Sequence, residues 1–282
     1  MTTSARKLTG DDLVLSHFTL ALDHPLDDRI SAAGAAGFAG IGLFAGQYGR
    51  LRSEGLDVEQ VREWLDEASI CIAEVEALSG WAAHAPTDDY FAFEHLVWEV
   101  VDTFESRYVQ AIAPYEGTLH DAATRFGELC DRAAEHGAVV GLEFLPFTNL
   151  VSAADTLQIV QEADRPNGGV CVDIWHHARG VDDLDMIRAI PGELITGIQM
   201  SDGPRAPQLD DYKDDCLRNR LPPGTGEFGA VEFVSTLLDA GVDLPWSLEV
   251  CNDDNWGRPA AEPAQRAADG MRHVLSEARS PR

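Results

Sequence analysis

The chain is short of basic residues, with 21 Lys and Arg against 48 Asp and Glu and a formal net charge of −27. A surface this acidic repels nucleic-acid phosphates and anionic lipid, which argues against a nucleic-acid enzyme of the usual basic kind. A solvated acidic surface is the simplest explanation of the charge. A small anionic substrate stays compatible with it where individual Arg residues line a pocket.

Cysteine is scarce, and long apolar runs are missing. The five cysteines form an odd set with no CxxC pair, and Cys71 and Cys171 lie in apolar runs where Cys usually behaves as a small buried hydrophobe. No segment approaches 18 uninterrupted apolar residues, and the first twelve residues, MTTSARKLTGDD, turn acidic where a signal peptide would be apolar. We therefore expect a cytoplasmic protein with no membrane partner.

Several familiar catalytic motifs are also missing. No glycine-rich GxGxxG follows the first strand-like segment, which disfavours a dinucleotide-binding fold. No GxSxG elbow, Walker loop or HExxH pair occurs either. The chemistry must therefore come from residues that are brought together by the fold.

Apolar, β-prone runs alternate with segments of helical spacing along the whole chain. Such alternation predicts parallel strands joined by right-handed crossovers. No Pro/Gly/Ser-rich linker divides the chain, so we predict a single (β/α)₈ TIM barrel over residues 1–282. The eight predicted strands are residues 13–20, 40–44, 71–78, 107–113, 138–144, 169–175, 194–200 and 245–250.

Four of the predicted strands carry, near their ends, a side chain that can bind a metal ion: Glu143, Asp173, Gln199 and Glu249. The carboxyl ends of barrel strands meet on one face, and three carboxylates placed there repel one another unless a cation lies between them. No basic residue is interleaved in these strands, which weakens the alternative that the acids only pair with Arg or cap helices. An oxygen-rich set favours one divalent ion, Mn²⁺ or Mg²⁺, with Co²⁺ able to substitute.

Further polar and aromatic residues follow the strand ends. His176, three residues after Asp173, is expected in a loop over the pocket, where imidazole binds a substrate oxygen or moves a proton. Arg205 is a candidate for binding a substrate hydroxyl or carboxylate. Trp81 and His84, beyond the third strand, are candidates for the pocket wall, although a Trp at a strand end is also common in core packing.

The longest predicted loop, residues 201–228, follows the seventh strand and should cover the site. Asp202 at its start can orient a ligand residue. Arg218 and Arg220 precede its Pro/Gly turn, so that this part of the loop could close on substrate. Arg179 could bind an anionic group or pair with an acid, and the sequence leaves the two open.

The runs GLEF (141–144), DIWHHARG (173–180), IQMSD (198–202), LPPGTGEF (221–228) and SLEV (247–250) resemble the sugar phosphate isomerase/epimerase family of xylose-isomerase-like TIM barrels. The resemblance implies one divalent metal held at Glu143, Asp173, Gln199 and Glu249. It also implies that His176, in the D-x-x-H position, contacts substrate. The partners it implies are small sugars or keto acids, and a homodimer is a further expectation.

One position departs from many epimerases of that family, which carry His where this chain has Gln199. Gln here, with the DGP segment and SLEVCND, is more similar to the 3-dehydroshikimate dehydratase branch, although LPPGTG and WHHARG differ from that branch. Either chemistry begins when a metal-bound carbonyl acidifies the neighbouring C–H. With Glu143 and Glu249 as proton carriers, return of the proton gives isomerisation or epimerisation of a sugar or related polyhydroxy ketone, which is the predicted function. Loss of a β-hydroxyl, with His176 as the acid, gives dehydration, which is the alternative.

Overall fold

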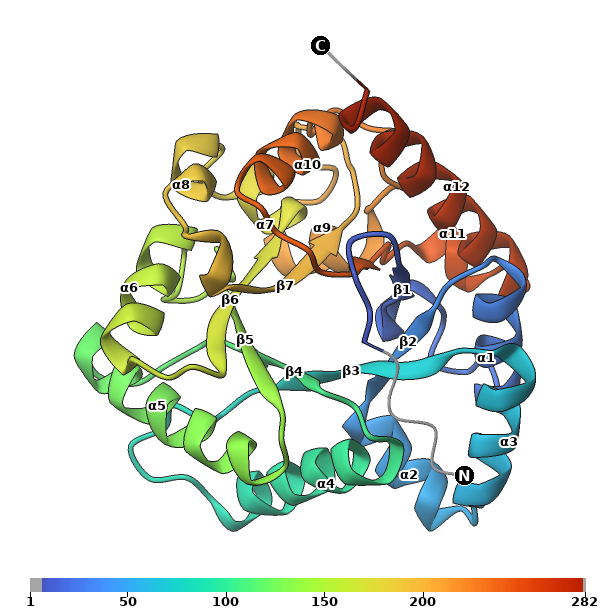
Figure 1. The fold of residues 1–282 in the computed structure, drawn as a ribbon, viewed down its shortest axis with the longest axis horizontal. Helices are drawn as coiled ribbons and strands as arrows, with labels where there is room; N and C mark the ends of the chain where they lie inside the picture. Colours follow the sequence, from blue (N-terminus) through green and yellow to red (C-terminus); the bar gives the residue numbers. More distant parts are fainter. Residues whose placement is uncertain (1–6, 281–282) are drawn as a thin grey trace.

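Strands in parallel register close on themselves in the middle of the molecule, and helices surround them (Figure 1). The structure is a computed structural model that describes residues 7–280. Each strand pairs with the next along the chain, and the last pairs with the first, Leu15 opposite Leu248. The strands are β1 (Leu13–Leu15), β2 (Gly40–Phe44), β3 (Cys71–Leu78), β4 (Tyr108–Ile112), β5 (Val139–Glu143), β6 (Gly168–Asp173), β7 (Ile195–Met200) and β8 (Trp246–Leu248).

Several of the connecting helices begin at side chains that satisfy their free N–H groups. Asp57, Thr87 and Ser152 each accept a hydrogen bond from the first turn of their helix, and Thr118 forms a capping box with Asp121. The helices are α1 (Leu26–Ala35), α2 (Ala45–Ser53), α3 (Val58–Ala68), α4 (Asp88–Phe104), α5 (Leu119–Glu135), α6 (Ala153–Ala163), α7 (Ile174–Arg179), α8 (Leu184–Arg188), α9 (Tyr212–Arg218), α10 (Ala230–Asp239), α11 (Asp253–Trp256) and α12 (Ala261–Ala278), with 3₁₀ turns η1 (His17–Thr19) and η2 (Gly192–Leu194).

The predicted (β/α)₈ barrel is confirmed, and the boundaries of β2 and β3 are as predicted. The other six predicted strands extend past the observed ones by at least one residue, and two of them run into a following helical turn. The strand predicted over 13–20 ends at Leu15, because Ser16 caps η1 and places His17 in that turn. The strand predicted over 169–175 ends at Asp173, whose side chain caps α7. His176 therefore lies in a helix, and the expectation of a loop there was wrong.

Polar side chains occupy the lumen of the barrel below the site. Glu76 of β3 accepts hydrogen bonds from Ser16 Oγ at 2.9 Å and from His17 N at 2.8 Å. Glu74, on the same strand, accepts from Ser247 Oγ at 2.6 Å. Gly42 makes room for this arrangement, because a Cβ atom there would lie 1.9 Å from Glu76 Oε1. The lumen thus holds buried carboxyl groups where apolar side chains are the commoner filling.

The ends of the chain lie outside the description. Residues 1–6 and 281–282, which the single-domain prediction also includes, are not among the described residues, and half of the stretch examined for a signal peptide falls there. Across residues 7–280, no helix has the length and apolar character needed to cross a membrane.

Candidate functional site

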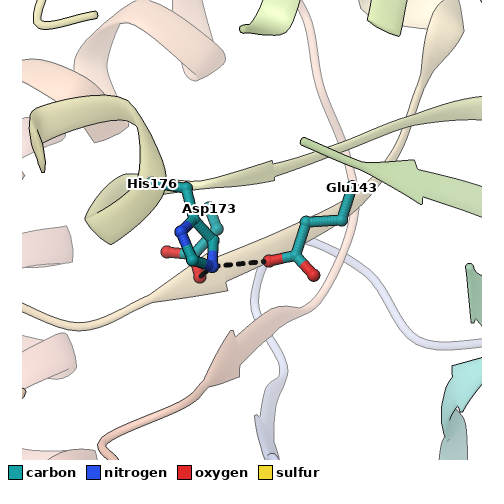
Figure 2. Close-up of side chains that lie close together, drawn as sticks. All are labelled: Glu143, Asp173 and His176. Carbon is teal, nitrogen blue, oxygen red and sulfur yellow. Dashed lines mark ion pairs between the residues drawn. The ribbon is translucent and has the colours of Figure 1, made fainter. Parts of the chain in front are cut away.

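Two carboxyl groups and one imidazole meet at the C-terminal face of the barrel (Figure 2). Glu143 is the last residue of β5, Asp173 the last of β6, and His176 lies in α7. His176 Nε2 is 3.5 Å from Glu143 Oε1 and 3.6 Å from Asp173 Oδ2. All three side chains are buried. The face predicted for the site is therefore the one where these groups gather.

Local structure sets this geometry. Asp173 Oδ1 accepts a hydrogen bond from Trp175 N at 2.7 Å, which starts α7 directly at the strand end. One helical turn then places His176 on the same face as Asp173. Glu143 reaches the pair from the neighbouring strand, since β5 and β6 are paired with Glu143 opposite Cys171. Short connections and parallel register thus bring residues thirty positions apart into contact.

The donor atoms of this cluster fit a divalent cation. One ligand atom from each of Glu143, Asp173 and His176 lies within 4.8 Å of the others. Glu143 Oε1 is buried and accepts no hydrogen bond. This is unfavourable for a carboxylate oxygen unless a cation binds it. Two carboxylates and an imidazole form a common ligand set for Zn²⁺ and similar ions.

The other two predicted ligands flank this cluster. Gln199 is the second-last residue of β7, and its Oε1 atom accepts a hydrogen bond from Gln110 Nε2 at 3.0 Å. The same amide of Gln110 donates to Glu143 Oε2 at 2.7 Å, so it links Gln199 to the cluster. Glu249 directly follows β8, and its backbone N–H donates to Met200 O. A lone Gln in the apolar run RYVQAIA was a sequence signal for Gln110 that the strand-end pattern overlooked.

A buried arginine stands between two of the carboxylates. Arg220 Nη1 donates to Asp173 Oδ2 at 2.8 Å and lies 3.1 Å from Glu249 Oε2. Its Nε atom donates to Cys216 O, and its guanidinium carbon lies 5.5 Å from the centre of the Trp175 ring. The sequence had placed Arg220 only in a covering loop. Part of the charge repulsion expected among the acids is therefore balanced by the protein itself.

Burial and charge move the pKa values of these groups in different directions. Burial and the charges of Asp173 and Glu249 raise the pKa of Glu143 well above its ordinary value. Burial also raises the pKa of Glu249, to about 8, although Arg220 opposes the rise. For Asp173 burial acts upward, yet Arg220 and His176 hold its pKa below the ordinary value. Burial lowers the pKa of His176 to about 4. One site thus contains an ionised carboxylate, proton-holding carboxyls and a neutral imidazole.

The stretch after β7 is fixed by Asp202. Its carboxylate accepts hydrogen bonds from the backbone N–H groups of Gly203, Gly224 and Phe228, which ties the two ends of the predicted covering loop together. Arg205 in this stretch is half exposed and forms an ion pair with Asp182. No contact joins Arg205 to the buried cluster among the described residues.

Two residues predicted for the pocket wall lie elsewhere than in the cluster. Trp81 is buried, donates from Nε1 to Ile112 O at 2.9 Å and packs edge-on against Phe126. This is the core-packing alternative that the sequence left open. His84 is exposed and forms a hydrogen bond with Arg125.

Arg179 and Arg218, which the sequence had left with alternative roles, both pair with acids. Arg179 forms a buried ion pair with Asp215. Arg218 is exposed and lies 3.9 Å from Asp253. Arg220 is thus the arginine of this region that enters the site.

Comparison with known proteins gives a family and several relatives. A family model described as xylose isomerase-like TIM barrel matches residues 30–276. A 3-dehydroshikimate dehydratase of Pseudomonas putida is 28% identical over 268 residues, 91% of this chain and 40% of that protein. A 3-dehydroshikimate dehydratase of Pseudomonas aeruginosa is 33% identical over 149 residues, 52% of this chain and 23% of that protein. The chain thus spans less than half the length of the curated relatives it matches.

Solved structures share the fold at low identity. The IOLI protein with a bound zinc atom superposes with a TM-score of 0.82 at 18% identity, over 96% of this chain and all of that one (100%). A D-psicose 3-epimerase crystallised in the presence of D-fructose superposes with a TM-score of 0.72 at 15% identity, over 95% of this chain and 100% of that one. At such identities the likeness establishes the barrel fold alone.

Proposed function

Because the chain belongs to the xylose isomerase-like TIM barrel family, we propose that it is a divalent-metal-dependent enzyme acting on a small polyhydroxylated ketone or keto acid. The reaction begins with removal of a proton from the carbon next to the carbonyl group. The observation that carries the proposal is the buried cluster of Glu143, Asp173 and His176 beside Glu249. Its groups differ in protonation state, as acid–base catalysis requires.

The metal ligands proposed are Glu143, Asp173, Gln199 and Glu249. His176 lies next to two of them, Glu143 and Asp173, and is proposed to contact substrate. The IOLI protein, which has the same fold, binds a zinc atom, and this supports a divalent cation in the present chain; Mn²⁺, Mg²⁺ and Co²⁺ are the ions proposed here. When bound, a divalent cation polarises the substrate carbonyl and acidifies the adjacent C–H.

The protein side chains supply the proton transfers. Burial raises the pKa of Glu249 to about 8 in the metal-free protein. A bound cation would lower this pKa, so that the carboxylate could accept a proton from substrate near neutral pH. Arg220 and Asp173 hold this carboxyl in place, since Arg220 bridges the two. Glu143 faces the site with Oε1 free of donors while Gln110 holds its other oxygen. The two glutamates are therefore the proposed proton carriers. His176 is the proposed acid for a leaving hydroxyl, and its neutral imidazole must first take up a proton to play that part.

Dehydration is the preferred outcome of this proton removal. The curated relatives matched over 91% and 52% of the chain are both 3-dehydroshikimate dehydratases, and the chain has Gln199 where many epimerases have His. In this reaction a proton leaves the carbon next to the ketone, a β-hydroxyl departs as one molecule of water, and enolisation of the remaining ketone gives an aromatic ring. We therefore propose a carbon–oxygen lyase of the 3-dehydroshikimate dehydratase type.

Isomerisation or epimerisation is the second candidate. It is favoured by the presence of two buried carboxyl groups with raised pKa, Glu143 and Glu249, because one can remove a proton and the other return it to the opposite face. A sugar or related polyhydroxy ketone without a leaving hydroxyl in the right position would follow this route.

Substrate binding by the remaining predicted residues is also a proposal. Arg205 is the proposed partner of a substrate carboxylate or hydroxyl, and it would have to leave Asp182 to reach one. His84 and Trp81 are proposed for the opposite wall, where only the exposed His84 can move without disturbing the core.

The setting proposed for the enzyme is the cytoplasm, with a small-molecule partner and no nucleic acid. No disulfide joins any of the five cysteines, all of which lie in the described residues, and this suits a reducing compartment. The net charge of −27 opposes binding to phosphate backbones. A homodimer is proposed because such barrels commonly pair.

The test follows the fate of candidate substrates in D₂O by NMR. Protein saturated with Mn²⁺, then diluted into Mg²⁺ buffer, is incubated with 3-dehydroshikimate and, separately, with a panel of ketohexoses. The lyase proposal expects an aromatic product from 3-dehydroshikimate, whereas the second candidate expects deuterium at the carbon next to the carbonyl of a ketose. If no substrate gave either an aromatic product or deuterium incorporation, the proposed proton removal would be contradicted.

A further inference from the structure

Helix α9 contacts α7 through side chains about one turn apart, Tyr212 on His176 and Asp215 on Arg179. Asp173, His176 and Arg179 lie three residues apart along the end of β6 and α7. Each has a partner in residues 208–220, which we name the α9 segment: Arg220 for Asp173, Tyr212 for His176 and Asp215 for Arg179. This one-to-one matching shows that the segment is docked on the site and is more than a solvent-covered connection.

Tyr212 makes the contact that bears on chemistry. Its hydroxyl lies 3.0 Å from His176 Nδ1, and the two rings stack at 6.0 Å with an interplanar angle of 16°. Phe147 contacts both rings, with its centroid 5.5 Å from that of Tyr212 and 6.2 Å from that of His176. With Nδ1 occupied by the hydroxyl, only Nε2 of His176 is left to face Glu143 and Asp173.

Contacts of Asp215 anchor the α9 segment, and they thereby fix the position of the Tyr212 ring. Asp215 is fully buried and pairs with Arg179, which is itself buried beneath Trp175. Asp215 also accepts hydrogen bonds from Gln208 N, Leu209 N and Asn219 Nδ2 at 3.1, 3.1 and 2.8 Å. A paired and fully hydrogen-bonded buried carboxylate of this kind defines one position for the helix that it anchors.

We propose that Tyr212 is a positioning residue that holds the His176 imidazole with Nε2 directed into the site. An imidazole ring can rotate by half a turn about its bond to Cβ, which exchanges the place of Nδ1 for that of a carbon atom. The hydroxyl bond and the stack oppose this rotation, so the nitrogen that faces substrate is set by a residue 36 positions away. This is the general role of a group that hydrogen-bonds the second nitrogen of a working histidine.

The predicted effect of Tyr212 on turnover rests on the proposed function. The orientation of the His176 ring does not. If His176 delivers a proton to a leaving hydroxyl, loss of the Tyr212 hydroxyl lowers kcat. The expected reduction is about tenfold, the value of one net hydrogen bond, and KM changes by less than about twofold. Tyr212→Phe removes only the hydroxyl and keeps the stack.

The test uses ¹⁵N-histidine-labelled, metal-free protein, with the His176 ring signals assigned by their loss in His176→Asn. In Tyr212→Phe, the ring nitrogen shifts of His176 should move, because Nδ1 loses its partner. Tyr115→Phe is the matched control, since Tyr115 lies at the same face and its hydroxyl does not contact His176. Melting curves confirm that both variants fold.

Unchanged His176 ring shifts in Tyr212→Phe would overturn the proposal, as would equal changes in the control. These shifts are read without substrate, so they stand even where no keto compound is turned over. Changed shifts with no activity on any substrate would therefore count against the proposed function and leave the role of Tyr212 intact. A kcat loss with unchanged shifts would count against positioning.

Discussion

The guanidinium of Arg220 bridges two acids of the site, donating to Asp173 Oδ2 at 2.8 Å and lying 3.1 Å from Glu249 Oε2. Both partners are carboxylates at strand ends, and all three groups are shielded from solvent. Removing one member of such a buried arrangement leaves an uncompensated charge, whereas an exposed ion pair contributes little.

Arg220→Gln should therefore destabilise the protein by about 3–5 kcal/mol. Arg218→Gln is the matched control, because Arg218 is two residues away, exposed and only 3.9 Å from its partner Asp253. It should change the free energy of unfolding by less than about 0.5 kcal/mol. Urea unfolding curves measure both. Similar midpoints for the two variants would show that the bridge does not stabilise the fold.

Only some residues of the site could be placed from the sequence. Glu143 and Asp173 could be placed because apolar strand runs end on them, and in a barrel every strand end lies on one face. Arg220 could not, since it is 47 residues from Asp173 and enters from an irregular stretch whose path no periodicity predicts. The sequence places His176 correctly beside Asp173 but predicts a loop where the structure has helix α7. The reason is that Asp173 caps this helix, which strand periodicity does not reveal. The direction of Trp81 likewise depends on packing against Phe126 that a strand end alone does not reveal.

The buried carboxyl of Glu74 predicts a pH dependence of stability. Burial, with the charge of Glu249, raises its pKa from 4.5 to about 7, while Ser247 and Glu76 oppose the rise. A raised pKa in the folded state means that the native protein holds the proton more tightly than the unfolded chain. The stabilisation is therefore complete below pH 4.5 and is lost as pH rises to about 7 and above, by about 3 kcal/mol at most.

Glu74→Gln removes this titration while keeping a side chain that can bond Ser247. The difference in unfolding free energy between wild type and variant, measured by urea titration from pH 5 to pH 8, should shift in favour of the variant as pH rises. A difference that is constant over this range would mean that Glu74 is ionised at the same pH in both states.

Metal binding should depend on Glu143. One divalent ion per chain is expected for wild type, and a ligand present at 100 times its Kd stabilises the folded state by about 2.7 kcal/mol. Glu143→Gln should abolish most of this gain, because the amide offers a weaker ligand to a divalent ion while Gln110 can still bond the side chain. Titration calorimetry with Mn²⁺ gives stoichiometry and affinity.

The control for this prediction is Glu116→Gln, which removes an exposed carboxylate that follows β4 on the same face. It should bind Mn²⁺ as wild type does. If Glu143→Gln also bound with wild-type affinity, the cluster of Glu143, Asp173 and His176 would not be the metal site.

The most direct test of the account is the ultraviolet absorbance of 3-dehydroshikimate solutions incubated with protein that has been stripped by a chelator and then resupplied with Mn²⁺. The account predicts growth of an aromatic absorbance with resupplied wild type and none with stripped protein. With Glu249→Gln at saturating Mn²⁺, it predicts a rate lower by about 10²–10⁴-fold. Turnover by the stripped protein, or by Glu249→Gln at the wild-type rate, would contradict the metal-dependent proton transfer proposed here, and no turnover by resupplied wild type would contradict dehydration.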